Sequence, residues 1–405
     1  MRLSVLFAAL ALAACADKVP PPVAPPPAAT GPIDADLAFL RAHGPVEVLA
    51  SPGGGLVAVS ARWQGRVMTS AVEPHGASLG YVNRPFLEAG KTGTPFDNYG
   101  GEDRFWLGPE GGQFGLYFAP GAPFATGSWQ TPHAMQEGEW EVTSRSPTAI
   151  TFARTMHVEN WSRATFDVAV SRTVRVLAGA EVRARFGAAP PAGTKWVAFE
   201  SDNRITNAGT RAWTRDTGLL SVWILGQYAP AADARVVVPF DAAASGPVVN
   251  DAYFGPIPPE RLRVHAREGW LTLAADGQQR GKIGLPPARA RPVLGSYTPG
   301  AGLLTLVACE RPGEAPDGYV NSAWAQQSEP YAGDVVNAYN DGPLAPGQPS
   351  LGGFYEIETS SPAAALAPGQ SMRHVHTTLH VVGDAATLEP LAKGVLGVGL
   401  KDVGR

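Results

Sequence analysis

The sequence has 405 residues, of which 44% are hydrophobic and 17% are charged, so it has enough apolar material for a full hydrophobic core. It contains 47 glycines and 38 prolines and few long amphipathic helical patterns, which favours an all-β protein rich in turns. The formal net charge of -4 and the lack of a Lys/Arg cluster argue against nucleic acid as a partner.

Residues 1–14 have the features of a bacterial lipoprotein signal peptide. Arg2 supplies the positive charge, residues 3–11 form a short apolar run, and Leu12-Ala13-Ala14-Cys15 resembles the lipobox, whose cysteine is acylated. The run is too short for a permanent spanning helix, whereas lipids on Cys15 would anchor the protein at a membrane surface. Because Ala16 rather than aspartate follows the cysteine, the resemblance to enterobacterial sorting signals indicates the outer membrane of the cell envelope.

The rest of the chain predicts one large domain. Residues 15–33, the acylated cysteine and a proline-rich tether, are expected to be extended, and residues 34–42 predict a short helix. Residues 46–384 consist of strand-like runs separated by Gly, Pro, Asn and Asp turns, without repeat or composition shift, which predicts a single large β-sandwich. Residues 385–405 predict a helical tail packed against it. Cys309, in an apolar run, is expected in the core.

Two strands near the C-terminus carry the densest ionisable chemistry. Side chains alternate along a strand, so Glu356 and Glu358 share one face of the first strand, and His374, His376 and His380 share one face of the second. We expect the two strands to adjoin as a hairpin. Three hypotheses then apply: two solvated faces, a carboxylate pair acting on glycosides, or a divalent metal site of imidazole and carboxylate ligands.

The segment 98–129 mixes glycines and aromatic residues with charged side chains, among them Glu102, Arg104 and Glu110. Glycines let a loop approach a ligand closely, and aromatic faces beside carboxylates and arginine suit the faces and hydroxyl groups of a sugar. The alternative is that the aromatic residues are core, which we expect for most of them.

Three segments, in order, resemble the aldose 1-epimerase (galactose mutarotase) superfamily: GYVNRP at 80–85, YGGEDRFW at 99–106 and YEIETSSP at 355–362. Three longer segments, GGEDRFWLGPEGGQF, DNRITNAG and GFYEIETSSP, resemble a family of uncharacterised bacterial proteins assigned to the same fold, over most of residues 46–383. The resemblance implies a β-supersandwich of one domain, with short terminal helices and a carbohydrate cleft on its concave face.

The resemblance also implies roles for individual residues. Glu358 matches the general base that removes the proton of the anomeric hydroxyl, and Arg84 matches a substrate-contacting arginine. Tyr99 stands where the superfamily has a histidine, and DNRITNAG lacks the histidine acid. Mutarotation needs a proton donor as well as a base, so His374 or His376 is the candidate replacement. The expected catalytic residues are Glu358, His374 and His376, and the expected ligand contacts are Arg84, Tyr99, Glu102, Arg104, Asn203 and Glu356.

These observations leave three hypotheses open. The first is a lipid-anchored, epimerase-like enzyme that transfers a proton at the anomeric centre of a saccharide. The second is a noncatalytic saccharide-binding lipoprotein that uses the same cleft. The third is a metal-dependent, carbohydrate-active enzyme; the first two need no cofactor. Glu358 is expected to matter more than Glu356, because Glu358 alone has the register of the superfamily motif.

Overall fold

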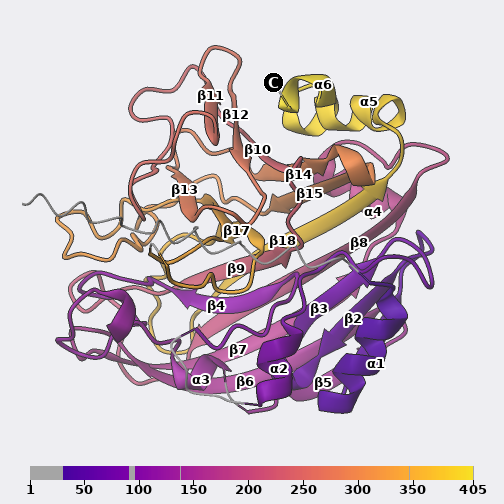
Figure 1. Ribbon diagram of the computed structural model, residues 1–405. Coiled ribbons are helices and arrows are strands. Elements are labelled where there is room, and N and C mark those ends of the chain that lie inside the picture. Colours follow the sequence, from indigo (N-terminus) through magenta and orange to yellow (C-terminus); the bar gives the residue numbers. More distant parts are fainter. Residues whose placement is uncertain (1–30, 91–95, 137, 346, 405) are drawn as a thin grey trace, which may run out of the picture.

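The structure, a computed structural model, describes residues 31–90, 96–136, 138–345 and 347–404. The predicted signal peptide, Cys15 and most of the predicted tether lie outside these ranges. Within them, three antiparallel sheets dominate and the helices are short (Figure 1), so the predicted all-β class is confirmed. None of the helices in the described ranges has the length and apolar character that a membrane crossing requires.

The largest sheet has ten strands, in the spatial order β11-β12-β10-β14-β15-β18-β8-β7-β6-β5. Its strands are β5 (Glu141–Ser146), β6 (Ala149–Glu159), β7 (Thr165–Val176), β8 (Lys195–Asn207), β10 (Arg235–Pro239), β11 (Leu262–His265), β12 (Trp270–Ala274), β14 (Val293–Thr298), β15 (Leu303–Cys309) and β18 (Ser371–Val382).

The second sheet has five strands in the order β13-β16-β17-β9-β4, and a third has the order β1-β2-β3. Their strands are β1 (Glu47–Ala50), β2 (Leu56–Ser60), β3 (Arg66–Ala71), β4 (Arg104–Gly108), β9 (Ser221–Tyr228), β13 (Gly281–Leu285), β16 (Val336–Asn340) and β17 (Tyr355–Ser360). The helices are α1 (Ile33–His43), α2 (Arg84–Ala89), α3 (His133–Gln136), α4 (Gly179–Phe186), α5 (Ala385–Leu396) and α6 (Leu400–Val403), with 3-10 turns at Ala61–Trp63, Thr126–Ser128 and Pro299–Ala301.

The five-stranded sheet packs face to face on the ten-stranded sheet (Figure 1). Alternate side chains of β7, such as Phe166, Val168 and Val170, point into the layer between the sheets, where they meet Ile224 and neighbouring residues of β9. All eight residues of β9 are buried, because side chains cover both faces of this strand. Its near-continuous apolar sequence follows from that position.

Helices α4, α5 and α6 cover the other face of the ten-stranded sheet. The α5 helix, expected from the sequence, begins after Asp384, whose side chain accepts a hydrogen bond from the backbone N–H of Thr387 at 2.8 Å. It ends at Gly397, which has a left-handed φ of 72°. Leu388 and Leu391 pack beside residues of β18, so the C-terminal tail is part of the core.

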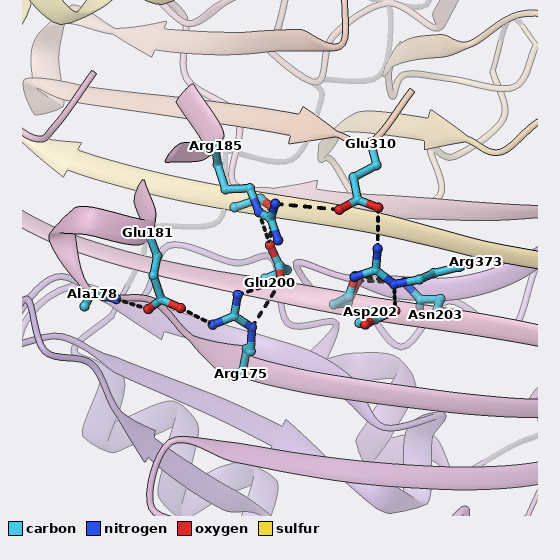
Figure 2. Close-up of polar contacts among 11 residues, drawn as sticks. Arg175, Ala178, Glu181, Arg185, Glu200, Asp202, Asn203, Glu310 and Arg373 are labelled. Carbon is cyan, nitrogen blue, oxygen red and sulfur yellow. Dashed lines mark hydrogen bonds and ion pairs between the residues drawn. The ribbon is translucent and has the colours of Figure 1, made fainter. Parts of the chain in front are cut away.

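An ion-pair network joins α4 to the same face of the sheet (Figure 2). Glu200 of β8 accepts hydrogen bonds from Arg175 of β7 and from Arg185 of α4, at 2.9 Å and 2.5 Å. Arg373 of β18 links Asp202 of β8 to Glu310 beyond β15. Polar side chains thus link the adjacent strands β7, β8 and β18 with one another and with α4.

The expected hairpin of the two charged strands is wrong. β17 pairs with β16 and β9, and β18 pairs with β15 and β8, so the two strands lie in different sheets. The predicted alternation is right, but the shared surface is the layer between the sheets. There the Thr359 hydroxyl lies 2.9 Å from one ring nitrogen of His374 and 2.9 Å from one of His376.

Glu356 and Glu358 alternate with Thr359 along β17 and therefore point away from the histidines. The imidazoles and the carboxylates lie on opposite sides of the five-stranded sheet. The described residues contain no group of three or more His, Cys, Asp or Glu side chains arranged to hold a metal ion. The metal-site hypothesis on these four residues therefore fails on geometry.

Candidate functional site

A hollow lies on the outer face of the five-stranded sheet, away from the ten-stranded sheet. Its free volume is about 60 Å³, enough for several water molecules, so the hollow is narrow. Outward-pointing strand residues form its floor: Arg104, Trp106, Trp223, Leu225, Gln227, Lys282, Tyr339 and Glu356. Its walls come from segments outside these strands: Phe96, Asn98, Glu110, Trp129, Phe254, Arg280, Trp324, Leu351 and Phe354.

The strand register places the charged floor residues in two rows. Gln227, Glu356, Tyr339 and Lys282 stand opposite one another on successive strands. Glu358 lies in the next row, between Leu225 and Asn337. β17 lies between β13 and β4 in the sheet. With this spacing, Arg104 of β4 reaches Glu356, and Lys282 of β13 reaches Glu358.

Each carboxylate of β17 has a cationic partner. The Arg104 guanidinium donates to Glu356, and Gln227 Nε2 donates to the same oxygen at 2.9 Å. Lys282 Nζ donates to Glu358 Oε2 at 3.0 Å, and Trp223 Nε1 donates to that oxygen at 2.9 Å. Glu356 lines the hollow, whereas the side chain of Glu358 is fully buried beside it.

The pKa values of the lining groups are shifted. Burial raises the pKa of Glu356 to about 7, although Arg104 opposes this change. Burial also raises the pKa of Glu110, against the influence of Lys282. Burial alone would lower the pKa of Lys282, but the negative charges of Glu358, Glu110 and Glu356 outweigh it and hold this pKa above its usual value. A carboxyl group that titrates near neutrality is suited to proton transfer.

Several polar atoms of the hollow lack a partner. Arg104 Nε, Trp106 Nε1, Gln227 Oε1 and Arg280 Nε are all buried and make no hydrogen bond among the described residues. Glu358 Oε1, beside the hollow, is in the same state. Buried polar groups in folded proteins are nearly always hydrogen-bonded, so unpartnered groups at a concave site indicate a place for bound water or ligand.

Of the expected site residues, Arg104 and Glu356 lie together in the hollow. Arg84 lies at the start of α2, where it pairs with Asp36 at 2.6 Å. Tyr99 packs against Trp63 and Phe86 and lines a separate hollow near α2. In both cases the motif matched in sequence, but the local chain runs beside α1 and α2 rather than over the five-stranded sheet.

Glu102 and Asn203 also lie outside the hollow, between the sheets. Glu102 Oε2 lies 2.8 Å from His380 Nε2 and 3.0 Å from the Ser70 hydroxyl. The Asn203 side-chain oxygen accepts a hydrogen bond from Arg172, which also pairs with Asp103. These polar side chains bond to one another in the core, although Glu102 Oε1 and Asp103 Oδ2 have no partner among the described residues, and neither Glu102 nor Asn203 lines the hollow.

His374 and His376 do not reach the hollow either. Burial lowers the pKa of His374 to about 3 and that of His376 to about 4, so both rings are neutral at pH 7. The five-stranded sheet separates them from Glu356. The expected substitution of one of them as the proton donor in this hollow is therefore wrong.

Sequence reasoning missed most of the lining residues. Lys282 and Gln227 each interrupt an otherwise apolar strand, a signal that was available in GKIGL and SVWILGQY. Phe254, Arg280 and Trp324 come from segments outside the strands and carry no such signal. Only the packing of these segments over the sheet brings them to the site.

Together, the fold and the hollow define an all-β protein of two packed open sheets, with a carboxylate-bearing, aromatic-walled site on the outer face of the smaller sheet. The chain belongs to a family of unknown function, DUF6786, whose model matches residues 32–405. None of the curated proteins matches it. The membership agrees with the uncharacterised family expected from the motifs.

Solved structures of similar architecture were found at low identity. A candidate aldose 1-epimerase from Escherichia coli K12 has a TM-score of 0.49 and 13% identity, covering 83% of this chain and 98% of that one. A galactose mutarotase-like protein from Lactobacillus casei ATCC 334 has a TM-score of 0.45 and 10% identity, with 83% and 100% covered. A galactose mutarotase related enzyme from Lactobacillus acidophilus has a TM-score of 0.47 and 10% identity, with 83% and 97% covered. The chemistry of the site must come from this chain's own residues.

Proposed function

We propose that the hollow binds a saccharide and that Glu356 transfers a proton there. The observation that carries this proposal is a carboxyl group with a pKa of about 7 on the floor of a hollow walled by aromatic rings. Aromatic faces pack against the apolar faces of sugar rings, and the unpartnered atoms of Arg104, Trp106 and Gln227 suit hydroxyl groups.

The reaction that suits these groups is epimerisation at the anomeric carbon. Glu356, as the base, removes the proton of the anomeric hydroxyl. The bond from the anomeric carbon to the ring oxygen breaks, and a proton donor protonates that oxygen, which leaves the open-chain aldehyde. Reclosure after rotation gives the other anomer and returns both protons.

Glu110 is the proton donor that we propose for this step. It lines the same hollow, and burial raises its pKa, which favours the protonated form that a general acid needs. Trp129 Nε1 donates to Glu110 Oε1 at 2.8 Å and fixes the carboxyl group. A glutamic acid would then fill the role for which the sequence offers no histidine. Glu358, paired with Lys282, would hold the floor in place and balance its charge.

The test is anomer interconversion of several aldoses followed by NMR. Glu356→Gln and Glu110→Gln should each lower the catalysed rate by about 10² to 10⁴, the usual worth of general base or acid catalysis. Contrary to the expectation from the sequence that Glu358 matters more than Glu356, we propose that Glu358→Gln costs less, because the side chain of Glu358 is buried beside the hollow and does not line it. Glu310→Gln, on the opposite side of the molecule, is the matched control and should leave the rate unchanged.

A wild-type rate equal to buffer would exclude epimerisation of the sugars tried. If saccharides then still bind, and Glu356→Gln weakens that binding, the noncatalytic binding hypothesis takes over. If the wild type neither accelerates anomer interconversion nor binds any of the sugars, the saccharide proposal is overturned. We also propose that the protein is held at the cell envelope by lipid on Cys15, on the sequence of residues 1–15 alone.

A further inference from the structure

Arg280 differs from the other two cations of the hollow. Arg104 is paired with Glu356 and Lys282 with Glu358, whereas Arg280 has no ion pair with any described carboxylate. Its Nε is buried and unpartnered among the described residues. The Arg280 side chain as a whole is only partly buried, but this N–H has lost its hydration and lacks a partner unless a ligand or water supplies an acceptor.

The guanidinium of Arg280 is nevertheless held in place. Its central carbon lies 3.6 Å from the ring centroid of Phe254 and 6.0 Å from that of Tyr339. Its backbone directly precedes β13, which carries Lys282 into the floor two residues later. Stacking uses the face of the guanidinium and leaves its N–H edges free. A fixed guanidinium fork suits the paired oxygens of a carboxylate or a phosphate.

The charge of the lining points the same way. The lining includes three cations, Arg104, Arg280 and Lys282, and two carboxyl groups, Glu110 and Glu356. Glu358, buried beside the hollow, balances the charge of Lys282. Burial raises the pKa of both carboxyl groups, which lowers the negative charge they carry near neutral pH. The unbalanced positive charge favours an anion over a neutral molecule.

We propose that Arg280 is a specificity-determining residue that binds an anionic group, a carboxylate or a phosphate, on the saccharide held in the hollow. The inference rests on the proposed saccharide site and names the class of sugar that it takes. Arg280 touches the acidic substituent, while Glu356 and Glu110 stay with the anomeric centre.

The test compares binding of neutral and acidic sugars by calorimetry on the domain from residue 31 onward. Glucose and galactose are the neutral probes, glucuronate and galacturonate supply the carboxylate, and glucose 6-phosphate supplies the phosphate. The wild type should bind at least one acidic sugar about tenfold or more tightly than its neutral counterpart, on the scale of a charged hydrogen bond. Which acidic probe binds best identifies the anion.

Arg280→Gln should remove that preference, lowering the affinity for the acidic sugar about tenfold or more relative to the affinity for its neutral counterpart. Arg280→Lys should keep part of it, because the charge stays but the fork is lost. Arg215→Gln is the matched control: Arg215 stacks on Tyr331 with its guanidinium carbon 4.3 Å from the ring centroid, outside the hollow, and its loss should change neither affinity.

Binding of the neutral sugars also reports that each variant is folded. Equal affinity for neutral and acidic sugars in the wild type, or a preference that Arg280→Gln leaves intact, would overturn this inference while the saccharide site stands. If no sugar of either class binds, the proposed saccharide site itself fails.

Discussion

Glu356 has contacts that act on its proton in opposite directions. Burial favours the neutral acid, while Arg104 and the hydrogen bond from Gln227 favour the carboxylate. The result is a pKa of about 7, where a small change in surroundings alters the fraction ionised. About half of the Glu356 side chains are therefore ionised, and able to act as a base, near pH 7.

The rate of any reaction that uses Glu356 as its base should therefore fall as the pH drops below about 7. Gln227→Met removes a hydrogen bond that stabilises the ionised form, so the pKa should rise and the acid limb should move to higher pH. The measurement is kcat/KM against pH for both proteins. If the acid limb of the pH profile has the same midpoint in Gln227→Met as in the wild type, a group other than Glu356 controls it.

His374 and His376 give the protein an acid-sensitive core. Their pKa values in the folded state, about 3 and about 4, lie below the ordinary value near 6.5, so the unfolded chain binds protons more readily. The stability that the two neutral rings contribute to the folded state is fully present above pH 6.5 and is lost as the pH falls toward 4 and below. At 1.36 kcal/mol per pH unit, acidification to pH 4 should cost on the order of 3 kcal/mol for each ring.

His376→Gln should flatten the loss of unfolding free energy between pH 6.5 and pH 4. The measurement is urea unfolding at a series of pH values, followed by circular dichroism. His157→Gln is the control, because His157 is an exposed residue at the surface of β6. Equal slopes for wild type and His376→Gln would contradict the buried neutral state.

At the level of elements, strand faces were predictable and strand partners were not. The alternation of Glu356 with Tyr355 and of His374 with Val375 follows from local geometry. β17 pairs with β16, the strand before it, but also with β9, more than a hundred residues earlier in the chain, and a one-dimensional pattern holds no information on that second choice. The mistaken hairpin and metal hypothesis both followed from treating successive strands as neighbours.

The ion pairs around Glu200 hold α4 on the ten-stranded sheet, and their contribution to stability can be measured. Glu200 is almost fully buried and accepts hydrogen bonds from Arg175 and Arg185 (Figure 2). It also accepts a hydrogen bond from the Thr377 hydroxyl. Glu200→Gln leaves two partly buried guanidinium groups without their shared carboxylate. We expect it to lower the free energy of unfolding by about 1 to 3 kcal/mol.

Asp202→Asn is the matched control for Glu200, since Asp202 lies on the same strand and also pairs with an arginine, Arg373. Both partners of that pair are partly exposed, so its loss should cost less than about 1 kcal/mol. Chemical denaturation of the two variants measures both effects. Equal costs would mean that burial of Glu200 adds nothing to the network.

At the scale of the whole molecule, composition and turn spacing were enough for the all-β class, because they depend on averages over the chain. The site was only partly predictable. Glu356 and Arg104 came from motifs, whereas Phe254, Arg280 and Trp324 are placed by loops that fold over a sheet assembled from distant segments. Arg84 and Tyr99 show the converse, since a matching motif did not bring them to the hollow.

We predict that lipid on Cys15 attaches the protein to the cell envelope. The chain has two cysteines, and only Cys15 follows a lipobox-like segment. Cys309 lies at the end of β15, where burial raises the pKa of its thiol to about 12, so it is a poor nucleophile. Acyl label should therefore depend on Cys15 alone.

Expression in a bacterium supplied with labelled palmitate tests this dependence. The wild type and Cys309→Ser should be labelled and sediment with membranes, whereas Cys15→Ser should lose the label and keep residues 1–14. If Cys15→Ser is still labelled, or if the wild type is not labelled, the proposal of a lipid anchor on Cys15 is overturned. The described strands begin at Glu47, so we expect Cys15→Ser to retain the far-ultraviolet circular dichroism and the sugar binding of the wild type. Loss of attachment is then separated from loss of the fold.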